Sequence, residues 1–270
     1  MSGRLLDLPG DLLSRLLIGY LTGPARQYHS YAISAPRVLS MVMRRGDVLL
    51  VEGNQRFSTA VKFLTQSTWS HAALYVSDLA PDTDESGEPL ALIEANLEHG
   101  VTAVPLKKYA GFNTRICRPV NLTPTDSEQV ARFMVKSLGL QYDLKNVIDL
   151  ARYLLPTPPV PEHWRRRMLA FGSGDPTRVI CSSLIAQAFQ SVQYPILPDI
   201  EKMPDYDPEK AQYTLKELLH IRHHTLFAPR DFDISPYFAV VKPTIEQGFD
   251  YRQLEWSETD FSTSRPELSQ

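Results

Sequence analysis

The sequence has few cysteines, no long apolar run and no excess of either charge. Cys117 and Cys181 are the two cysteines in 270 residues, too few for a disulfide framework and too far apart for a zinc-type pair. No stretch reaches the roughly 18–20 apolar residues that a membrane-spanning helix needs. The net charge of −3 and the pI of about 6.2 argue against a nucleic-acid partner. We therefore expect a protein of a reducing compartment, without a metal or another cofactor.

The composition is that of a globular protein, with 43% hydrophobic and 22% charged residues. The length suffices for one large domain with additions. We predict an N-terminal amphipathic helical extension over residues 1–40, one domain over 41–245 and a polar tail over 246–270. Residues 156–175, where prolines precede a basic piece, are predicted to be an insertion, either a cap over a cleft or a plain surface excursion.

The N-terminal extension contains an apolar face over residues 12–21, which predicts an amphipathic helix that ends at Gly23-Pro24. Residues 1–11 carry one Arg against two Asp, and no clear cleavage site follows, so we expect no signal peptide. Two interpretations stay open: the helix packs on its own domain, or it makes a peripheral contact with a membrane. The expected location is cytoplasmic, with membrane association left open.

The chain is organised around residues 46–76. A short apolar run at 48–51 predicts a buried strand, 57–64 alternates at helical spacing, and 72–76 predicts a second strand. His71 stands just before this second strand, directly after Trp69 and Ser70. A histidine at the end of a strand can face a cleft, or it can be a core histidine bonded to a backbone carbonyl.

The segment 90–96 predicts the strand that returns beside 72–76. The apolar pattern favours a register in which His71 lies opposite Glu94; a slip of two residues would place Asn96 there instead. A carboxylate or amide beside an imidazole is what orients a catalytic histidine. The alternative is an ordinary exposed strand glutamate.

A second candidate functional residue is Cys181, which lies where a helical period begins in residues 178–189. In the first turn of a helix the backbone N–H groups and the dipole favour a thiolate, and the same groups can bind an oxyanion. A free buried cysteine is the alternative. Cys117, inside a predicted strand and without a positioned histidine, is interpreted as structural. Further elements are predicted as strands at 101–106, 114–120 and 238–241, and as helices at 125–138, 144–155 and 212–224.

The combination of these motifs resembles the YiiX/YebB-like cysteine hydrolases, which belong to the circularly permuted branch of the NlpC-type papain-like superfamily. In that branch the histidine precedes the cysteine, as it does here. The resemblance covers roughly residues 44–195. It implies an α+β, papain-like fold, with a central antiparallel sheet packed against a core helix that carries the cysteine. The motifs are Gly-Asp-Val-Leu-Leu-Val at 46–51, Ser-Thr-Trp-Ser-His-Ala-Ala-Leu-Tyr-Val at 67–76, Ile-Glu-Ala at 93–95, Gly-Leu-Gln-Tyr-Asp at 139–143 and Cys-Ser-Ser-Leu-Ile at 181–185.

Carried over to this sequence, the resemblance implies Cys181 as nucleophile, His71 as general base and Glu94 as the orienting residue. One departure concerns the second residue after the cysteine, which is often acidic in the family and is Ser183 here; this puts the local substrate contacts in doubt. The residues expected to bind substrate are Tyr142, Trp69, Ser70 and Ser182.

The expected reaction is hydrolysis of an amide bond, in a peptide or an acylated amine, through a thioester on the cysteine. A lipid-directed acyltransferase or deacylase of the same fold is the first alternative. A catalytically silent ligand-binding module is the second. The expected partner is therefore a small peptide or acylated substrate, which could be lipid-like; the oligomeric state is not indicated.

Overall fold

A computed structural model describes residues 19, 22–24, 30, 34–80, 83–96, 99–140, 180–197, 199–201, 218–220 and 227–253. The predicted helix at 144–155, the insertion at 156–175 and Tyr142 lie outside the described residues. So does almost all of the predicted N-terminal helix over 12–21.

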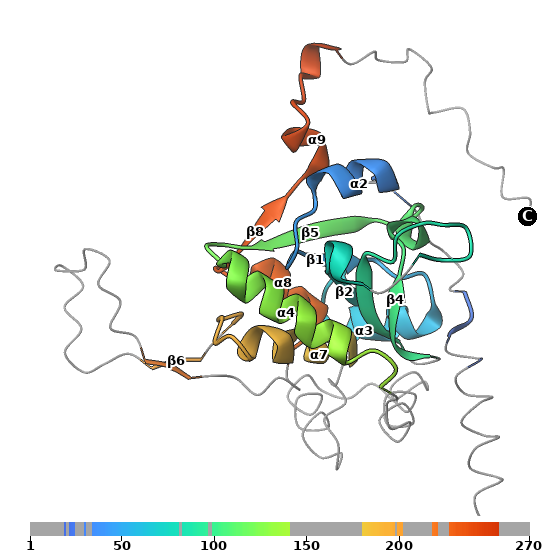
Figure 1. The fold of residues 1–270 in the computed structure, drawn as a ribbon. Helices are drawn as coiled ribbons and strands as arrows, with labels where there is room; N and C mark the ends of the chain where they lie inside the picture. The colour runs from blue at the N-terminus through green and yellow to red at the C-terminus, as the bar shows by residue number, and fades with distance from the viewer. Residues whose placement is uncertain are drawn as a thin grey trace, which may run out of the picture.

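Six strands of the described chain form one antiparallel sheet, in the order β4-β3-β2-β1-β5-β8 (Figure 1). The first four follow one another as a meander, and β5 then returns to the free side of β1. The strands coincide with short runs of apolar residues, as the sequence predicts. Their bounds are β1 Val48–Val51, β2 His71–Tyr75, β3 Leu92–Asn96, β4 Gly100–Val104, β5 Thr114–Pro119 and β8 Phe238–Val241.

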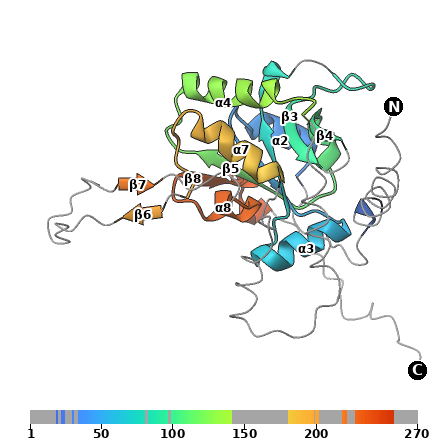
Figure 2. The ribbon, with the colours of Figure 1, turned by 90° about the horizontal axis from the view of Figure 1, so that it is seen from below.

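One face of the sheet is covered by α4, Pro124–Lys136, and α7, Ile180–Gln190 (Figure 2). Thr123 caps α4 by accepting a hydrogen bond from the backbone N–H of Asp126 at 3.1 Å. α3, Arg56–Thr65, connects β1 to β2 and adds Val61 to the same core. The largest apolar side chains of this core include Leu50, Leu74, Ile93, Met134, Ile185 and Phe189.

The other face carries α2, Pro36–Val42, and the short 3₁₀ helix η2, Leu106–Tyr109, which pack on Leu49, Tyr75 and Leu92. Leu39 of α2 is fully buried in this second core. The domain boundary predicted at residue 41 therefore falls inside a helix that belongs to the folded unit. The remaining short helices are α8 Pro229–Ile234, α9 Pro243–Glu246, η1 Ser77–Leu79 and η4 Tyr251–Gln253.

The prediction of a helix over 212–224 is wrong for residues 218–220. These form β7, Leu218–His220, which pairs with β6, Asp199–Glu201, in a separate two-stranded sheet. A helical period over a short stretch is a weak local preference, and pairing with a strand distant in sequence overrides it.

The register of β2 on β3 also differs from the prediction. Ala73 lies opposite Glu94 and Leu74 opposite Ile93, which is a slip of two residues. Extended by two residues, this register sets His71 level with Asn96. The physical reason is that a two-residue slip keeps every side chain on its own face, so an apolar pattern alone does not distinguish the two registers.

Candidate active site

The three residues predicted to act together do meet at one end of the sheet. His71 is the first residue of β2, Glu94 is the middle residue of β3, and Cys181 is the second residue of α7. All three line a pocket of about 300 Å³. The sheet therefore supplies the histidine and the carboxylate, and the helix packed on it supplies the thiol.

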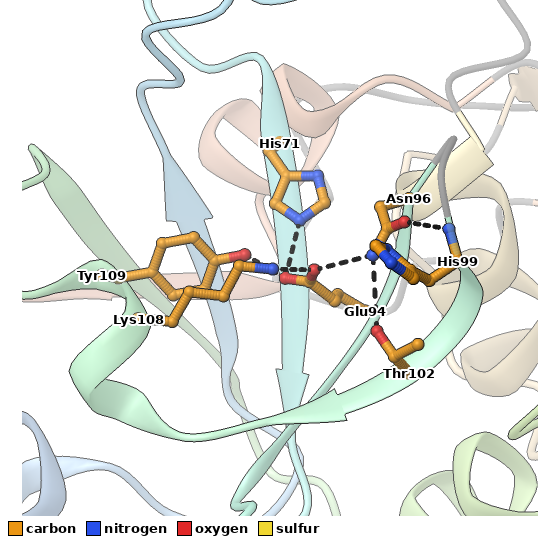
Figure 3. A network of polar contacts seen from close by, with 7 residues as sticks. All are labelled: His71, Glu94, Asn96, His99, Thr102, Lys108 and Tyr109. Carbon is orange, nitrogen blue, oxygen red and sulfur yellow. Dashed lines mark hydrogen bonds and ion pairs between the residues drawn. The ribbon is translucent and has the colours of Figure 1, made fainter. Parts of the chain in front are cut away.

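Glu94 is the centre of the polar contacts (Figure 3). Its side chain is 1% exposed, and its Oε2 accepts a hydrogen bond from His71 Nε2 at 3.1 Å. The same oxygen accepts from the Tyr109 hydroxyl. The other oxygen, Oε1, forms an ion pair with Lys108 Nζ and accepts from Asn96 Nδ2 at 3.3 Å. A carboxylate has about four acceptor positions, and here four donors reach it.

Glu94 keeps its predicted place beside His71 although the register has slipped. Its longer side chain reaches the imidazole diagonally across the two strands, which aromatic and long side chains can do. Asn96 does not take that role: its amide donates to Glu94 and to Thr102 Oγ1, and its Oδ1 accepts from the backbone N–H of His99 at 2.7 Å. Asn96 therefore supports the carboxylate rather than the imidazole.

His71 lies between Cys181 and Glu94. Its Nε2 is bonded to Glu94, and it also makes a side-chain hydrogen bond with Cys181, for which Nδ1 is the remaining ring nitrogen. Burial disfavours the imidazolium, but the charges of Cys181 and Glu94 outweigh burial and raise the pKa of His71 to about 10. The site thus favours the protonated form of the His71 imidazole.

The carboxylate and the tyrosine respond to the same charges. Burial disfavours the ionised form of Glu94, but His71 and Lys108 outweigh it and hold the pKa of this carboxyl well below its usual range. Burial and the Glu94 charge raise the pKa of Tyr109 well above its ordinary value. Tyr109 is therefore a hydroxyl donor, and Glu94 an acceptor, throughout the neutral pH range.

Cys181 is 4% exposed and lies in the first turn of α7. The helix is held in place by Ile185, Ala188 and Phe189, all fully buried, so the thiol has a fixed position relative to the sheet. The first backbone N–H groups of a helix have no partner within it and point outward. Cys181 therefore lies in the first turn of a helix, as the sequence predicts.

Two of the residues predicted to bind substrate are placed elsewhere. Trp69 is buried in the helix-side core, donates from Nε1 to Asp233 Oδ2 at 3.0 Å and has the Arg115 guanidinium 5.0 Å from its ring centre. Ser182 is fully buried, and its hydroxyl donates to the carbonyl of Phe227 at 2.6 Å. Neither lines the pocket, because each is held by a polar partner distant in sequence.

Ser70 does line the pocket, and its Oγ accepts from the backbone N–H of Gly53 at 2.9 Å. Gly53 and Ser58, which sequence reasoning missed, form the adjacent wall. A Cβ on Gly53 would lie 2.2 Å from Ser58 Oγ, so a side chain at residue 53 would displace this wall. A glycine two residues after the end of a buried strand is a signal of such a close approach.

Cys117 lies in the interior of β5 and is fully buried. Burial, with the Asp233 carboxylate as a second cause, raises the pKa of this thiol far above its ordinary value. It is a packing residue, as predicted.

Comparison with known proteins finds a distant structural similarity and no sequence family. No family model matches the chain, and no curated protein matches it at a significant level. Among solved structures it is similar to the crystal structure of the metalloprotein yiiX from Escherichia coli O157:H7, at 17% identity and a TM-score of 0.41, over 74% of this chain and 96% of that one. A similarity this loose carries no argument about activity, so the chemistry is interpreted from the contacts of this chain.

Within the described residues, no group of three or more His, Cys, Asp or Glu side chains is arranged to hold a metal ion. No helix of the described ranges is long and apolar enough to cross a membrane.

Proposed function

We propose that the chain is a thiol hydrolase of the permuted papain-like type, with Cys181 as nucleophile, His71 as general base and acid, and Glu94 as the orienting carboxylate. The observation that carries this proposal is the continuous series of contacts from Cys181 through His71 to Glu94 at one pocket. Nucleophile, base and orienting group within hydrogen-bond reach are the signature of an activated thiol.

The reaction follows from these positions. The Cys181 thiolate attacks the carbonyl carbon of an amide. The backbone N–H groups of the first turn of α7, which also contains Cys181, donate hydrogen bonds to the resulting oxyanion. As the C–N bond breaks, His71 gives its proton to the leaving amine and a thioester remains on Cys181. Water then gives a proton to His71 and attacks the thioester, the C–S bond breaks, and the acid leaves with the thiolate restored.

The pocket suits a small acyl group. Its wall combines the hydroxyls of Ser58 and Ser70 with the rings of Phe57 and Phe112, so a short acyl chain or a peptide fragment finds both polar and apolar contacts. Amide hydrolysis is our first assignment. The two aromatic rings favour, as the second candidate, acyl transfer or deacylation on a lipid-like substrate.

The test is to trap the thioester. The protein is incubated with a panel of acyl p-nitroanilides and p-nitrophenyl esters of increasing chain length, quenched in acid and measured by intact-protein mass spectrometry. We expect the mass of one acyl group, mapped to Cys181, in the wild type and in Cys117→Ser, and no adduct in Cys181→Ala. An adduct that persists in Cys181→Ala, or none with any of the panel, would contradict the proposal and favour a silent binding module.

A further inference from the structure

The Glu94 carboxylate has polar contacts with residues other than His71. Lys108 and Tyr109, adjacent residues of η2, both reach it, one on each carboxylate oxygen. Tyr109 bonds the oxygen that faces His71, while Lys108 pairs with the oxygen that faces away. Figure 3 shows the two side chains approaching Glu94 from the same side, opposite Asn96. These contacts come from an element that lies outside the Cys–His–Glu series.

We propose that Lys108 and Tyr109 are positioning residues of the site, which act through Glu94 on the reaction of His71. The inference rests on the proposed function and adds two roles to it. Tyr109 fixes the carboxylate oxygen that receives the imidazole N–H. Lys108 balances the carboxylate charge, so that the imidazolium is held strongly enough to form and weakly enough to release its proton to a leaving group.

Charge balance supports the role of Lys108. With the ion pair formed, the pocket holds Cys181 and Glu94 as anions and His71 and Lys108 as cations, which cancel. Without Lys108 the 1%-exposed carboxylate would be balanced by His71 alone. A buried carboxylate that loses one of its partners attracts the remaining cation more strongly. Proton release from His71, the step that expels the leaving amine, would then be disfavoured.

Further titratable groups face the imidazole or its pocket, and they come from three elements and one loop. Glu94 comes from β3, Lys108 and Tyr109 from η2, and Cys181 from α7; His99, just before β4, lines the same pocket. The Lys108 side chain is 41% exposed, so solvent screens its charge and the expected effect is moderate.

The experiment measures the titration of His71 by NMR of the imidazole ¹H–¹³C pair, with the resonance assigned by its loss in His71→Asn. Cys181→Ala serves as the background, because it removes the thiolate and brings the titration into a convenient range. Adding Lys108→Met should raise the pKa of His71 by about half a unit to one unit. Lys108→Arg keeps the charge and should restore the background value.

Lys107→Met is the matched control. It makes the same charge change one residue away. The Lys107 side chain is exposed, its charge helps to lower the pKa of Asp84, and it does not line the pocket. We expect the pKa of His71 to stay within about 0.2 units of the background in this variant. A role confined to fastening η2 to the sheet would lower the melting temperature of Lys108→Met without moving the titration, and that result would overturn the inference.

In the full site, with Cys181 present, Lys108→Met should shift both limbs of the kcat/KM pH profile to higher pH by a similar amount. The reason is that a more negative pocket holds each proton more tightly. Tyr109→Phe changes no charge, so we expect kcat to fall about three- to tenfold at nearly constant KM, with the limbs unmoved. A shift of the limbs in Tyr109→Phe and none in Lys108→Met would contradict the assigned roles.

Failure of this inference is distinguishable from failure of the proposed function. The NMR titration needs neither a substrate nor a reactive thiol. If no acyl adduct forms on Cys181 but Lys108→Met shifts the titration of His71, the hydrolase assignment fails and the coupling through Glu94 stands. If the adduct forms and the titration does not move, the hydrolase assignment stands and the role of Lys108 is wrong.

Discussion

Glu94→Gln removes the charge beside His71 and keeps the shape of the side chain. The wild-type carboxylate is nearly fully buried and accepts from His71 Nε2 at 3.1 Å. A glutamine offers one oxygen in place of two and adds an N–H₂ donor, so it cannot accept from all four donors that surround residue 94. The substitution therefore weakens both the charge and the orientation of the imidazole.

The expected size of the pKa shift and of the activity loss in Glu94→Gln follows from the lost charge. An opposite charge at hydrogen-bonding distance shifts a pKa by about 1–3 units, so the pKa of His71 should fall from about 10 by that amount. Each unit corresponds to about 1.4 kcal/mol. At neutral pH we expect kcat/KM to fall about 10- to 100-fold with little change in KM, a smaller loss than in His71→Asn.

The same shift makes stability depend on pH with a definite sign. The pKa of His71 rises on folding from 6.5 to about 10, so its stabilising contribution is complete below about pH 6.5 and is lost as the pH rises toward 10. The advantage of the wild type over Glu94→Gln in urea unfolding should therefore shrink over that window. An unchanged pKa of His71 in Glu94→Gln, measured by NMR, would refute the reasoning.

Three further variants separate the site from its surroundings. Asn96→Ala removes a support of Glu94 but no charge, so kcat/KM should fall less than in Glu94→Gln; the opposite order in steady-state kinetics would give Asn96 the orienting role. Cys117→Ser should keep most of the acyl-adduct yield of the wild type, since this thiol is buried away from His71; loss of the adduct without loss of fold, checked by circular dichroism, would contradict this. Trp69→Phe removes the hydrogen bond to Asp233, so the free energy of unfolding should fall by about 1–2 kcal/mol with KM unchanged. A higher KM without a loss of stability would indicate that Trp69 contacts the substrate.

The sequence predicts the parts of the site that depend on local pattern. Short apolar runs give β1, β2, β3, β5 and β8 to within about two residues, since a buried strand needs little else. The helical period after Cys181 places the thiol in a first turn. The apolar alternation of β3 puts Glu94 on the same face as His71, and this survives the register slip because the slip is an even number of residues.

Contacts between distant segments are what the sequence does not predict. Lys108 and Tyr109 follow a strand and carry no motif, yet the turn at η2 directs both to Glu94. Trp69 stands two residues before His71, but its buried N–H bonds Asp233, 164 residues further along the chain. Buried polar groups must find partners, and local sequence does not identify which distant partner each group finds.

The most direct test of the central assignment is the pH dependence of Cys181 alkylation by iodoacetamide, followed peptide by peptide with mass spectrometry. Cys117 in the same protein is the internal reference. If His71 holds Cys181 as a thiolate, Cys181 reacts at least about 100-fold faster than Cys117 at pH 6, and His71→Asn abolishes this advantage at that pH. If the two cysteines react at similar rates, or if His71→Asn leaves the rate at Cys181 unchanged, the Cys181–His71 ion pair is absent and the proposed mechanism is wrong.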